Sequence, residues 1–327
     1  MRSFSEGIGF VNEVQRSGWE EAKGKFGMGE EEAKRWWEWY EREVCVPWVV
    51  YEGEGGLEEV VGSDEGEAED LDKLPLVVRD LKEVRFGGKV YPLEGEGLYR
   101  FVVMTKSVRN LIVSRSDDPV PVLRALSSLQ VHGNRDDGRN TEELKGLLLH
   151  RAFLCITCGT IASLTVSLLK DLGFRARFVS ALTSEDWNTY DNGHGLCEVF
   201  LPGEGRWVLA DVDMGFLFRG DGNLLSAYEF CERINGEGEV EFVPLSEKFV
   251  DPFFSSPRGF NWFLRVRYMW RGSEGKKAWY RRIFQAVGIR EGKRTTFFGP
   301  EDKLHLYYGN EVEVVPQREW RERFYGG

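Results

Sequence analysis

The chain has 327 residues, of which 42% are hydrophobic and 30% charged, and it carries a formal net charge of −11 at pH 7. This composition is typical of a soluble globular protein with room for two or three domains, and the negative charge argues against broad affinity for nucleic acids or anionic membranes. The five cysteines lack the regular spacing of a disulfide framework, the N-terminal segment lacks the apolar core of a signal peptide, and no apolar run is long enough to span a membrane. We therefore expect a cytoplasmic protein with no membrane partner.

The first fifty residues have a helical pattern. Between Glu21 and Trp36, a turn glycine and spaced apolar residues resemble the helix-turn-helix of DNA-binding domains, the apolar positions being Ala22, Phe26, Met28, Ala33 and Trp36. Three glutamates at 30–32 would open the recognition helix, where DNA contacts usually come from basic or amide side chains. The sequence therefore predicts a small helical module over residues 1–50. Nucleic-acid binding through residues 20–40 is an alternative that the charge disfavours.

The middle of the chain changes character twice. Residues 51–75 are acidic and rich in glycine, which predicts a linker. Residues 76–250 are predicted to form the catalytic domain, which begins with β-like runs at 98–104 and 108–113. Helices are then expected from Asp118 and from Asn140, and these helices lead to the segment in which the chemistry is predicted.

Cys158 begins a run of apolar residues with helical spacing. The apolar stripe consists of Ile161, Ala162, Thr165, Leu168, Leu169 and Leu172, and the following Gly173 is a typical helix C-cap residue. This places Cys158 near a helix N-terminus, where unpaired backbone N–H groups and the helix dipole favour the thiolate. Cys158 is therefore a candidate nucleophile.

Two strands downstream can supply a base and a group that orients it. Residues 194–200 and 206–211 are predicted to form an antiparallel pair joined by a turn rich in proline and glycine. If Glu198 faces Trp207, the pairing places His194 opposite Asp211. Asp211 could then hold one imidazole nitrogen of His194 and leave the other to accept the proton of Cys158. We expect a Cys-His-Asp triad.

The same segments resemble the transglutaminase-like domain of the papain-like cysteine enzymes. The resemblance covers residues 118–235 and rests on four pieces in order: Cys158-Gly-Thr-Ile-Ala162, Leu172-Gly-Phe-Arg-Ala-Arg177, His194-Gly-Leu-Cys-Glu198 and Trp207-Val-Leu-Ala-Asp211. It implies an α+β fold whose catalytic helix packs on an antiparallel sheet, and no cofactor. It also implies acyl transfer on the amide bonds of a protein or peptide substrate, either hydrolysis as in a cysteine protease or transamidation as in an acyltransferase.

The resemblance also directs attention to the surroundings of the triad. An oxyanion would be stabilised by the backbone N–H of Cys158 and by an upstream side chain, for which Gln130 is the candidate. The polar loop 183–193 leads into His194, so its residues Trp187, Tyr190 and Asn192 are predicted to bind substrate. The family often has an aromatic residue at position 196 and a proline at position 212, where this chain has leucine and valine.

Two alternatives compete with the triad. A buried cysteine is more often a packing residue than a nucleophile, and the fold could serve a non-catalytic scaffold. Zinc is the other alternative, because Cys155-x-x-Cys158 and His194-x-x-Cys197 resemble pairs of metal ligands. On a regular strand His194 and Cys197 point to opposite faces, which disfavours a shared metal. Cys155 and Cys197 are therefore interpreted as packing residues.

Residues 251–327 are predicted to form a C-terminal extension. Between Arg258 and Arg294 basic residues outnumber acidic ones and alternate with aromatic residues. This mixture suits binding of nucleic acid or of an acidic partner through residues 258–294. It equally suits a helix that packs its aromatic residues inward and pairs its arginines within the chain, which is the interpretation we favour. The last thirty residues are predicted to be a short β tail.

Overall fold

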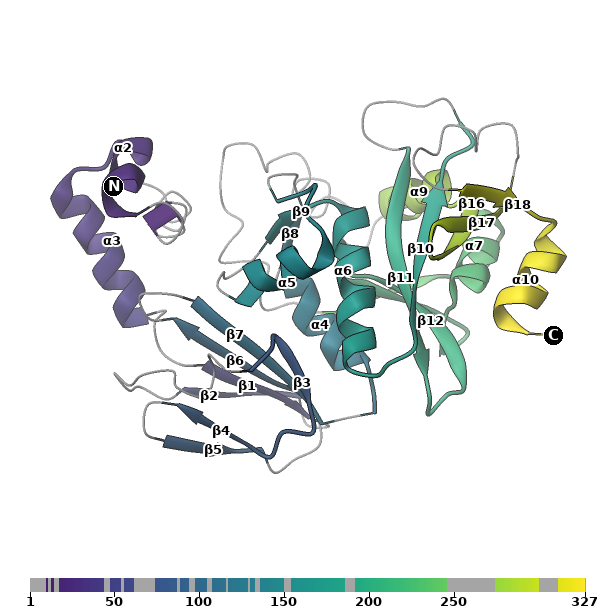
Figure 1. The fold of residues 1–327 in the computed structure, drawn as a ribbon. Coiled ribbons are helices and arrows are strands. Elements are labelled where there is room, and N and C mark those ends of the chain that lie inside the picture. The colour runs from purple at the N-terminus through teal and green to yellow at the C-terminus, as the bar shows by residue number, and fades with distance from the viewer. Residues whose placement is uncertain are drawn as a thin grey trace. The chain divides into compact units, whose positions relative to one another are not determined.

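The computed structural model divides the chain into two compact units (Figure 1). Unit 1 comprises Met1–Asp117, Gly138–Leu154 and Glu247–Asn261, and unit 2 comprises Asp118–Asp137, Cys155–Ser246 and Trp262–Gly327. The structure describes residues 10, 13–14, 18–43, 48–53, 56–61, 74–86, 89–93, 98–104, 108–115, 117–128, 130–132, 136–149, 154–185, 192–245, 274–299 and 311–326. The units do not follow the boundaries predicted at residues 75 and 250, because the segment 76–117 belongs to unit 1 and the segment 262–327 belongs to the unit that holds Cys158.

The N-terminal part of unit 1 contains the two helices that the sequence predicts, α2 (Trp19–Phe26) and α3 (Glu30–Glu43). The chain turns between them at Gly27, which has the left-handed φ of 57° that glycine tolerates. The inner faces of the module bury Phe10, Ala22, Met28 and Ala33. Lys23 pairs with glutamates at positions 20 and 30, so the charge of this lysine is compensated within the module.

The remainder of unit 1 is built around a five-stranded sheet with the order β2-β1-β6-β7-β3. Its strands are β1 (Trp48–Gly53), β2 (Gly56–Val61), β3 (Val77–Arg79), β6 (Leu98–Met104) and β7 (Val108–Ser114), and β4 (Glu83–Phe86) pairs separately with β5 (Lys89–Pro92). The predicted linker over 51–75 is wrong over its first part, because β1 and β2 form a hairpin there and β1 also pairs with β6. Backbone pairing with a distant strand, which composition does not reveal, outweighs the acidic and glycine-rich character of this segment.

Helix α5 (Thr141–Leu149) confirms the helix start predicted at Asn140. The Glu143 backbone N–H donates to Asn140 Oδ1 at 3.0 Å, and the Asn140 backbone N–H donates to a Glu143 carboxylate oxygen at 2.9 Å. This reciprocal capping box satisfies two of the N–H groups that a helix leaves unpaired at its start.

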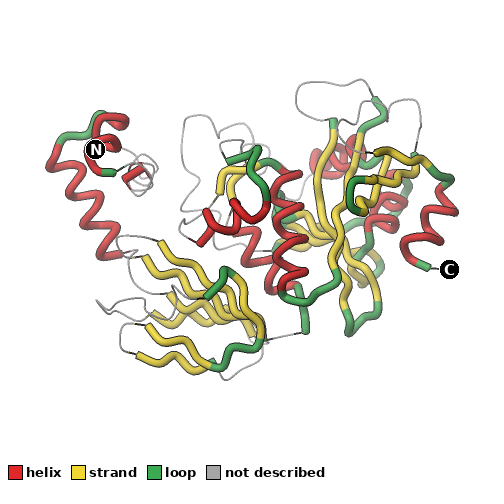
Figure 2. Tube along the Cα trace, in the orientation of Figure 1, coloured by secondary structure: helices red, strands yellow, loops and turns green. Residues whose placement is uncertain are grey.

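Unit 2 is organised on a larger, mostly antiparallel sheet, drawn in yellow in Figure 2, whose main path runs β14-β13-β12-β11-β10-β16-β17-β18. Its strands are β10 (Ala176–Leu182), β11 (Gly193–Leu201), β12 (Arg206–Asp211), β13 (Phe216–Gly220), β14 (Asn223–Leu224), β15 (Glu241–Pro244, paired with β13), β16 (Ala286–Glu291), β17 (Arg294–Phe298) and β18 (Glu311–Val314). Two short strands, β8 (Gln130–His132) and β9 (Leu154–Ile156), form a separate pair. Helices combined with this sheet confirm the predicted α+β class.

Helices cover both faces of the central strands of this sheet (Figure 1). The helices of unit 2 are α4 (Val120–Ser128), α6 (Cys158–Asp171), α7 (Ala227–Asn235), α9 (Glu274–Ile283) and α10 (Gln317–Tyr325). Helix α6 lies on one face of β10 and β11, and it buries the stripe that the sequence predicts, with Ile161, Leu168 and Leu169 among its members. The other face forms a core in which Leu196 of β11 packs with residues of α7, α9 and α10. None of the helices in the described part of the chain is both long and apolar enough to cross a membrane.

The C-terminal segment is part of this core rather than an extension of it. Strand β16 pairs directly with β10, so residues 286–291 lie beside the strand that precedes the predicted triad histidine. The predicted β tail is wrong for residues 317–325, which form α10. The spacing of Trp320 and Phe324 explains the helix, because residues four apart share one helical face and both of these side chains are buried.

Glu198 of β11 ties four elements of unit 2 together. Its fully buried carboxylate accepts from Arg177 Nε of β10 at 2.7 Å, from the Ala227 backbone N–H of α7 at 2.6 Å and from Tyr325 Oη of α10 at 2.6 Å. A cation and two further donors therefore compensate the buried charge.

Replacing Glu198 by alanine should lower the free energy of unfolding by about 3–5 kcal/mol, because it leaves Arg177 without its carboxylate in a largely buried position. Urea unfolding of the full chain measures this difference. As a control, Glu241→Ala removes the carboxylate of a solvent-exposed pair with Arg219 and should have little effect. Equal losses for the two variants would contradict the assignment.

Candidate active site

Cys158 is the first residue of α6, as the sequence predicts. The N-cap residue Thr157 has extended backbone angles of φ −80° and ψ 167°, and its side chain does not cap the helix. Instead, Thr157 donates from its backbone N–H at 3.0 Å and from its hydroxyl at 3.3 Å to Asp137 Oδ1. The N–H groups of the first turn are thus left uncapped by Thr157, and together with the helix dipole they favour an anion beside Cys158.

The strand register predicted for His194 and Asp211 is wrong by two residues. Glu198 lies opposite Leu209 rather than opposite Trp207. Side chains alternate along a strand with a period of two, so a shift of two residues leaves Asp211 on the same face of the sheet as His194. The two residues are diagonal neighbours, and His194 Nε2 lies 2.7 Å from Asp211 Oδ2.

The strand and the helix make direct backbone contact beside the predicted nucleophile and base. A Cβ atom added to Gly195 would lie 2.6 Å from Gly159 Cα and 2.9 Å from Gly159 N. Only a glycine at position 195 allows this approach, because the space that a side chain would need is occupied by backbone atoms. The residue after His194 therefore touches the residue after Cys158.

The charge state of His194 follows from three neighbouring effects. Burial by itself lowers the pKa of this histidine, whereas the charges of Asp211 and Cys158 and hydrogen bonds to both raise it, and the net result is a pKa well above 6.5. Because Nε2 is engaged by Asp211, Nδ1 is the nitrogen left for Cys158. The imidazolium form is fully present below pH 6.5 and is lost only as the pH rises through the raised pKa.

Asp211 receives two more hydrogen bonds that sequence reasoning missed. The Met214 backbone N–H donates to Oδ1 at 2.8 Å, and Tyr280 Oη of α9 donates to Oδ2 at 2.6 Å. Beside it, the ring of Trp279 meets the imidazole of His194 edge to face, with centroids 5.1 Å apart. Trp279 and Tyr280 belong to the segment 258–294, in which the sequence shows an alternation of basic and aromatic residues. No local signal in that segment identifies Asp211 and His194 as the partners of these two side chains.

The structure gives Gln130 a partner close to Asp211. Gln130 is buried, and its Nε2 donates to the carbonyl oxygen of Asp213 at 3.1 Å and lies 3.5 Å from that of Val212. The amide therefore braces the turn that follows Asp211. Its predicted contact with an oxyanion stays a prediction.

Of the three predicted substrate-binding residues, Trp187 and Tyr190 lie outside the described residues. Asn192 is half-buried immediately before β11, and its carbonyl oxygen accepts from the Thr183 backbone N–H at 3.0 Å. This bond joins the two ends of the polar loop 183–193. Substrate binding by the three residues stays a prediction.

The other cysteines of unit 2 are buried. Cys197 donates from Sγ to the Ala210 carbonyl oxygen at 3.7 Å, and its pKa is raised by burial and by the nearby charges of Asp211 and Glu198. Cys155 is also buried. Within the described residues, no group of three histidine, cysteine or acidic side chains is arranged to hold a metal ion. Both cysteines occupy packing positions, as interpreted from the sequence.

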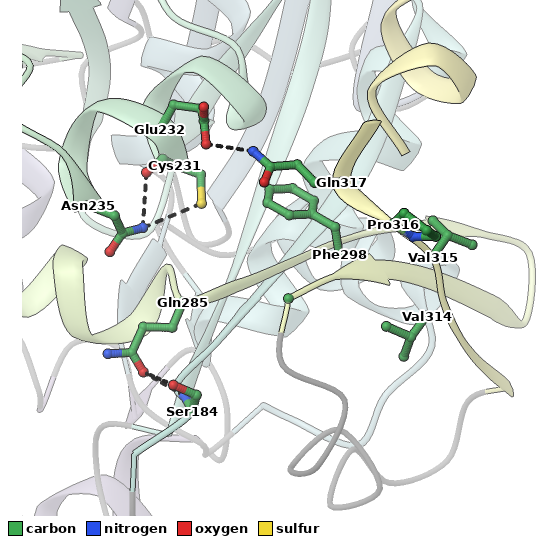
Figure 3. Close-up of a pocket in the computed structure, with 11 residues that line it drawn as sticks. Ser184, Cys231, Glu232, Asn235, Gln285, Phe298, Val314, Val315, Pro316 and Gln317 are labelled. Atoms are coloured by element: carbon green, nitrogen blue, oxygen red, sulfur yellow. Dashed lines mark hydrogen bonds between the residues drawn. The ribbon is translucent and has the colours of Figure 1, made fainter. Parts of the chain in front are cut away.

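A cavity of about 640 Å³ in unit 2 lies apart from the predicted triad residues (Figure 3). It is lined by α7, by the end of β17 and by the connection from β18 to α10, with Cys231, Glu232 and Gln317 among its side chains. Burial raises the pKa of Cys231 to about 12, so this thiol is neutral at physiological pH. None of Cys158, His194 and Asp211 lines the cavity.

Comparison with known families agrees with this geometry. Residues 155–212 match the family model of the transglutaminase-like superfamily, which confirms the resemblance found in the sequence. The matched segment contains Cys158, His194 and Asp211, and it ends before α9 begins. Proteins of this superfamily are commonly enzymes, among them cysteine peptidases and transglutaminases. Searches of curated proteins and of solved structures found no significant match.

Gly195→Ala should separate α6 from β11, because the added methyl group would overlap the backbone of Gly159. Overpacking of this kind typically costs about 1–3 kcal/mol, and we expect a loss of unfolding free energy in this range together with slower alkylation of Cys158. Gly159→Ala is the matched control, since a Cβ atom there meets nothing within 4 Å and alanine favours the helix. Urea unfolding and thiol labelling measure both effects, and similar behaviour of the two variants would contradict the close contact.

Proposed function

We propose that the chain is a cysteine-dependent enzyme that transfers acyl groups from the amide bonds of a protein or peptide substrate. The observation that carries the proposal is the hydrogen bond of 2.7 Å between His194 Nε2 and Asp211 Oδ2, both side chains being almost fully buried. With Nε2 engaged, the second ring nitrogen is available to Cys158 at the start of α6. Nucleophile, base and orienting group therefore come from three elements of one core.

In the proposed reaction, the Cys158 thiolate attacks the amide carbonyl carbon and forms a C–S bond. The amide C–N bond then breaks as His194 donates its proton to the leaving amine, which yields a thioester. Water or a second amine next attacks the thioester carbonyl and gives its proton to His194. The C–S bond breaks and the thiolate is restored, with a carboxylic acid or a new amide as the product. Asp211 keeps the imidazole in one tautomer throughout.

The start of α6 supports the stabilisation of the oxyanion that forms in both steps. The Cys158 backbone N–H belongs to the first turn, which Thr157 leaves uncapped, and the helix dipole adds positive potential at the same place. Gln130 is proposed as the second donor. In that role, the NH₂ group of Gln130 would donate one hydrogen to the oxyanion and the other to the backbone carbonyl group that it already contacts.

A non-catalytic role explains the site less well. A buried carboxylate paired with a titratable histidine adds little net stability to a core, because apolar residues of similar size usually stabilise a protein as well or better. The arrangement of the described cysteines likewise gives no support to a zinc site. In the described part of 258–294, Tyr280 is buried and Arg281 bonds to the Ile234 carbonyl oxygen, which favours packing over nucleic-acid binding.

Iodoacetamide labelling tests whether His194 activates Cys158. At pH 6 an ordinary thiol is well under about 1% ionised, so the intact protein should alkylate Cys158 at least about tenfold faster than the His194→Gln variant. At pH 10 thiolate formation no longer needs the histidine, and the two rates should converge. Peptide mapping by mass spectrometry identifies the labelled residue. Equal rates at pH 6 would contradict activation, and unequal rates at pH 10 would reveal a difference in access.

Product analysis tests the reaction itself. The full chain is incubated with a mixed peptide library that contains backbone and side-chain amides, with and without hydroxylamine as a competing acceptor. We expect the intact protein to form carboxylic acids or hydroxamates. Their rate of formation should fall by about a thousandfold or more in Cys158→Ala and should be retained in Cys155→Ala. If hydroxylamine causes hydroxamates to form in place of acids, the chemistry is transamidation. If acids form both with and without hydroxylamine, the chemistry is hydrolysis. A reactive Cys158 without either product would overturn the proposal for these substrates.

A further inference from the structure

We propose that Tyr280 is a positioning residue of the triad, whose hydroxyl shares one oxygen of Asp211 with His194 and thereby limits how strongly Asp211 favours the imidazolium. This inference rests on the proposed function. It concerns a residue of α9, outside the segment 155–212 that matches the superfamily model. Tyr280 acts through Asp211 and has no assigned contact with a substrate.

The geometry around the carboxylate is the starting point. Tyr280 Oη lies 2.6 Å from Asp211 Oδ2, and His194 Nε2 lies 2.7 Å from the same atom. The second oxygen, Oδ1, accepts from the Met214 backbone N–H at 2.8 Å. Two donors on Oδ2 and one on Oδ1 therefore hold a carboxylate that is shielded from water.

The phenol ring cannot turn away from this position easily, because it is fully buried in an aromatic cluster. The surrounding rings have centroids between 4.8 and 6.1 Å from that of Tyr280, and they belong to Phe218, Phe230, Phe242, Trp279 and Phe284. Close packing of this kind restricts the ring to one rotamer. The hydroxyl is thus presented to Asp211 by the core of unit 2.

Sharing an acceptor has a definite electrostatic consequence. A carboxylate oxygen that receives a neutral O–H donor has less negative charge to offer to a second, charged donor. Removing the phenol hydroxyl should strengthen the interaction of Asp211 with the imidazolium of His194. The Met214 N–H and His194 still hold the carboxylate in place, so its orientation should be retained.

Cys158 on α6 interacts electrostatically with His194, and Cys197 on β11 interacts with Asp211. Two further titratable groups are close in sequence to the residues of the network: Asp213, two residues after Asp211, and Lys276, which lies one turn before Tyr280 on α9 and places Nζ 4.1 Å from the centroid of the Phe216 ring. Tyr280→Phe leaves all of these groups and the aromatic ring in place. A change in the titration of the site in this variant therefore reports the loss of one hydroxyl.

The test follows the alkylation of Cys158 by iodoacetate across the neutral and alkaline range. Iodoacetate is an anion, so its reaction with the thiolate is fastest while the neighbouring imidazolium keeps its proton, and the alkaline decline of the rate reports loss of that proton. In Tyr280→Phe we expect this decline to move to higher pH by about half a unit or more.

Tyr325→Phe is the matched control. Tyr325 Oη donates to a buried carboxylate, that of Glu198, at the same distance of 2.6 Å, but this carboxylate holds Arg177 instead of the triad histidine. Both variants should lower the melting temperature, since each loses a hydrogen bond to a buried charge. Only Tyr280→Phe should change the alkylation profile.

An alkaline decline in Tyr280→Phe that stays where it is in the intact protein, or that moves to lower pH, would overturn the inference. An equal shift in Tyr325→Phe would also overturn it, because the effect would then be a general result of lost stability. NMR titration of labelled imidazole, with the His194 signal assigned from a His194→Gln spectrum, provides the same comparison without any alkylation. If Cys158 does not react with iodoacetate in the intact protein, the proposed function fails, whereas the NMR shift still tests the role of Tyr280.

Discussion

The buried carboxylate of Asp211 is the constraint on which the site depends. Taking an ionised carboxylate out of water costs several kcal/mol unless charge-assisted hydrogen bonds replace the lost hydration. Three donors from three parts of unit 2 replace it: His194 of β11, the Met214 N–H of the turn after β12, and Tyr280 of α9. Strand, turn and helix must all be in place before this charge is compensated, so formation of the site is coupled to formation of the core.

The same core contains a second buried carboxylate with a different consequence. Glu198 receives a tyrosine hydroxyl, as Asp211 does, but its partner is Arg177, and arginine is a permanently charged residue type. Glu198 therefore joins elements permanently. The partner of Asp211 is a histidine, whose pKa is lowered by burial and raised by Asp211 and Cys158, with a net rise. Two similar carboxylate networks on one strand thus differ in one partner, which is an arginine for Glu198 and a histidine for Asp211.

The cysteines show how environment separates one residue type into different roles. Burial raises the pKa of Cys197 and Cys231, which leaves both thiols protonated and packed. Among the four cysteines in the described part of the chain, Cys158 is the half-exposed one, and it lies at a helix start beside His194. The contact of Gly195 with Gly159 brings this helix start against the strand, so two residues without side chains allow Cys158 to lie beside His194.

The sequence by itself determined several local elements, among them α2, α5 and α6, and it identified the three residues that we propose as the triad, because apolar periodicity, capping residues and turn residues act over a few positions. It determined that His194 and Asp211 share a face but not their register, since face alternates every residue whereas register depends on the whole hairpin. Only the tertiary structure decided that β16 extends the sheet beside β10, that α10 replaces a β tail, and that Tyr280, 69 residues after Asp211, donates to its carboxylate. Such partners are chosen by packing and by backbone pairing between distant segments, for which no local pattern in a single sequence contains a signal.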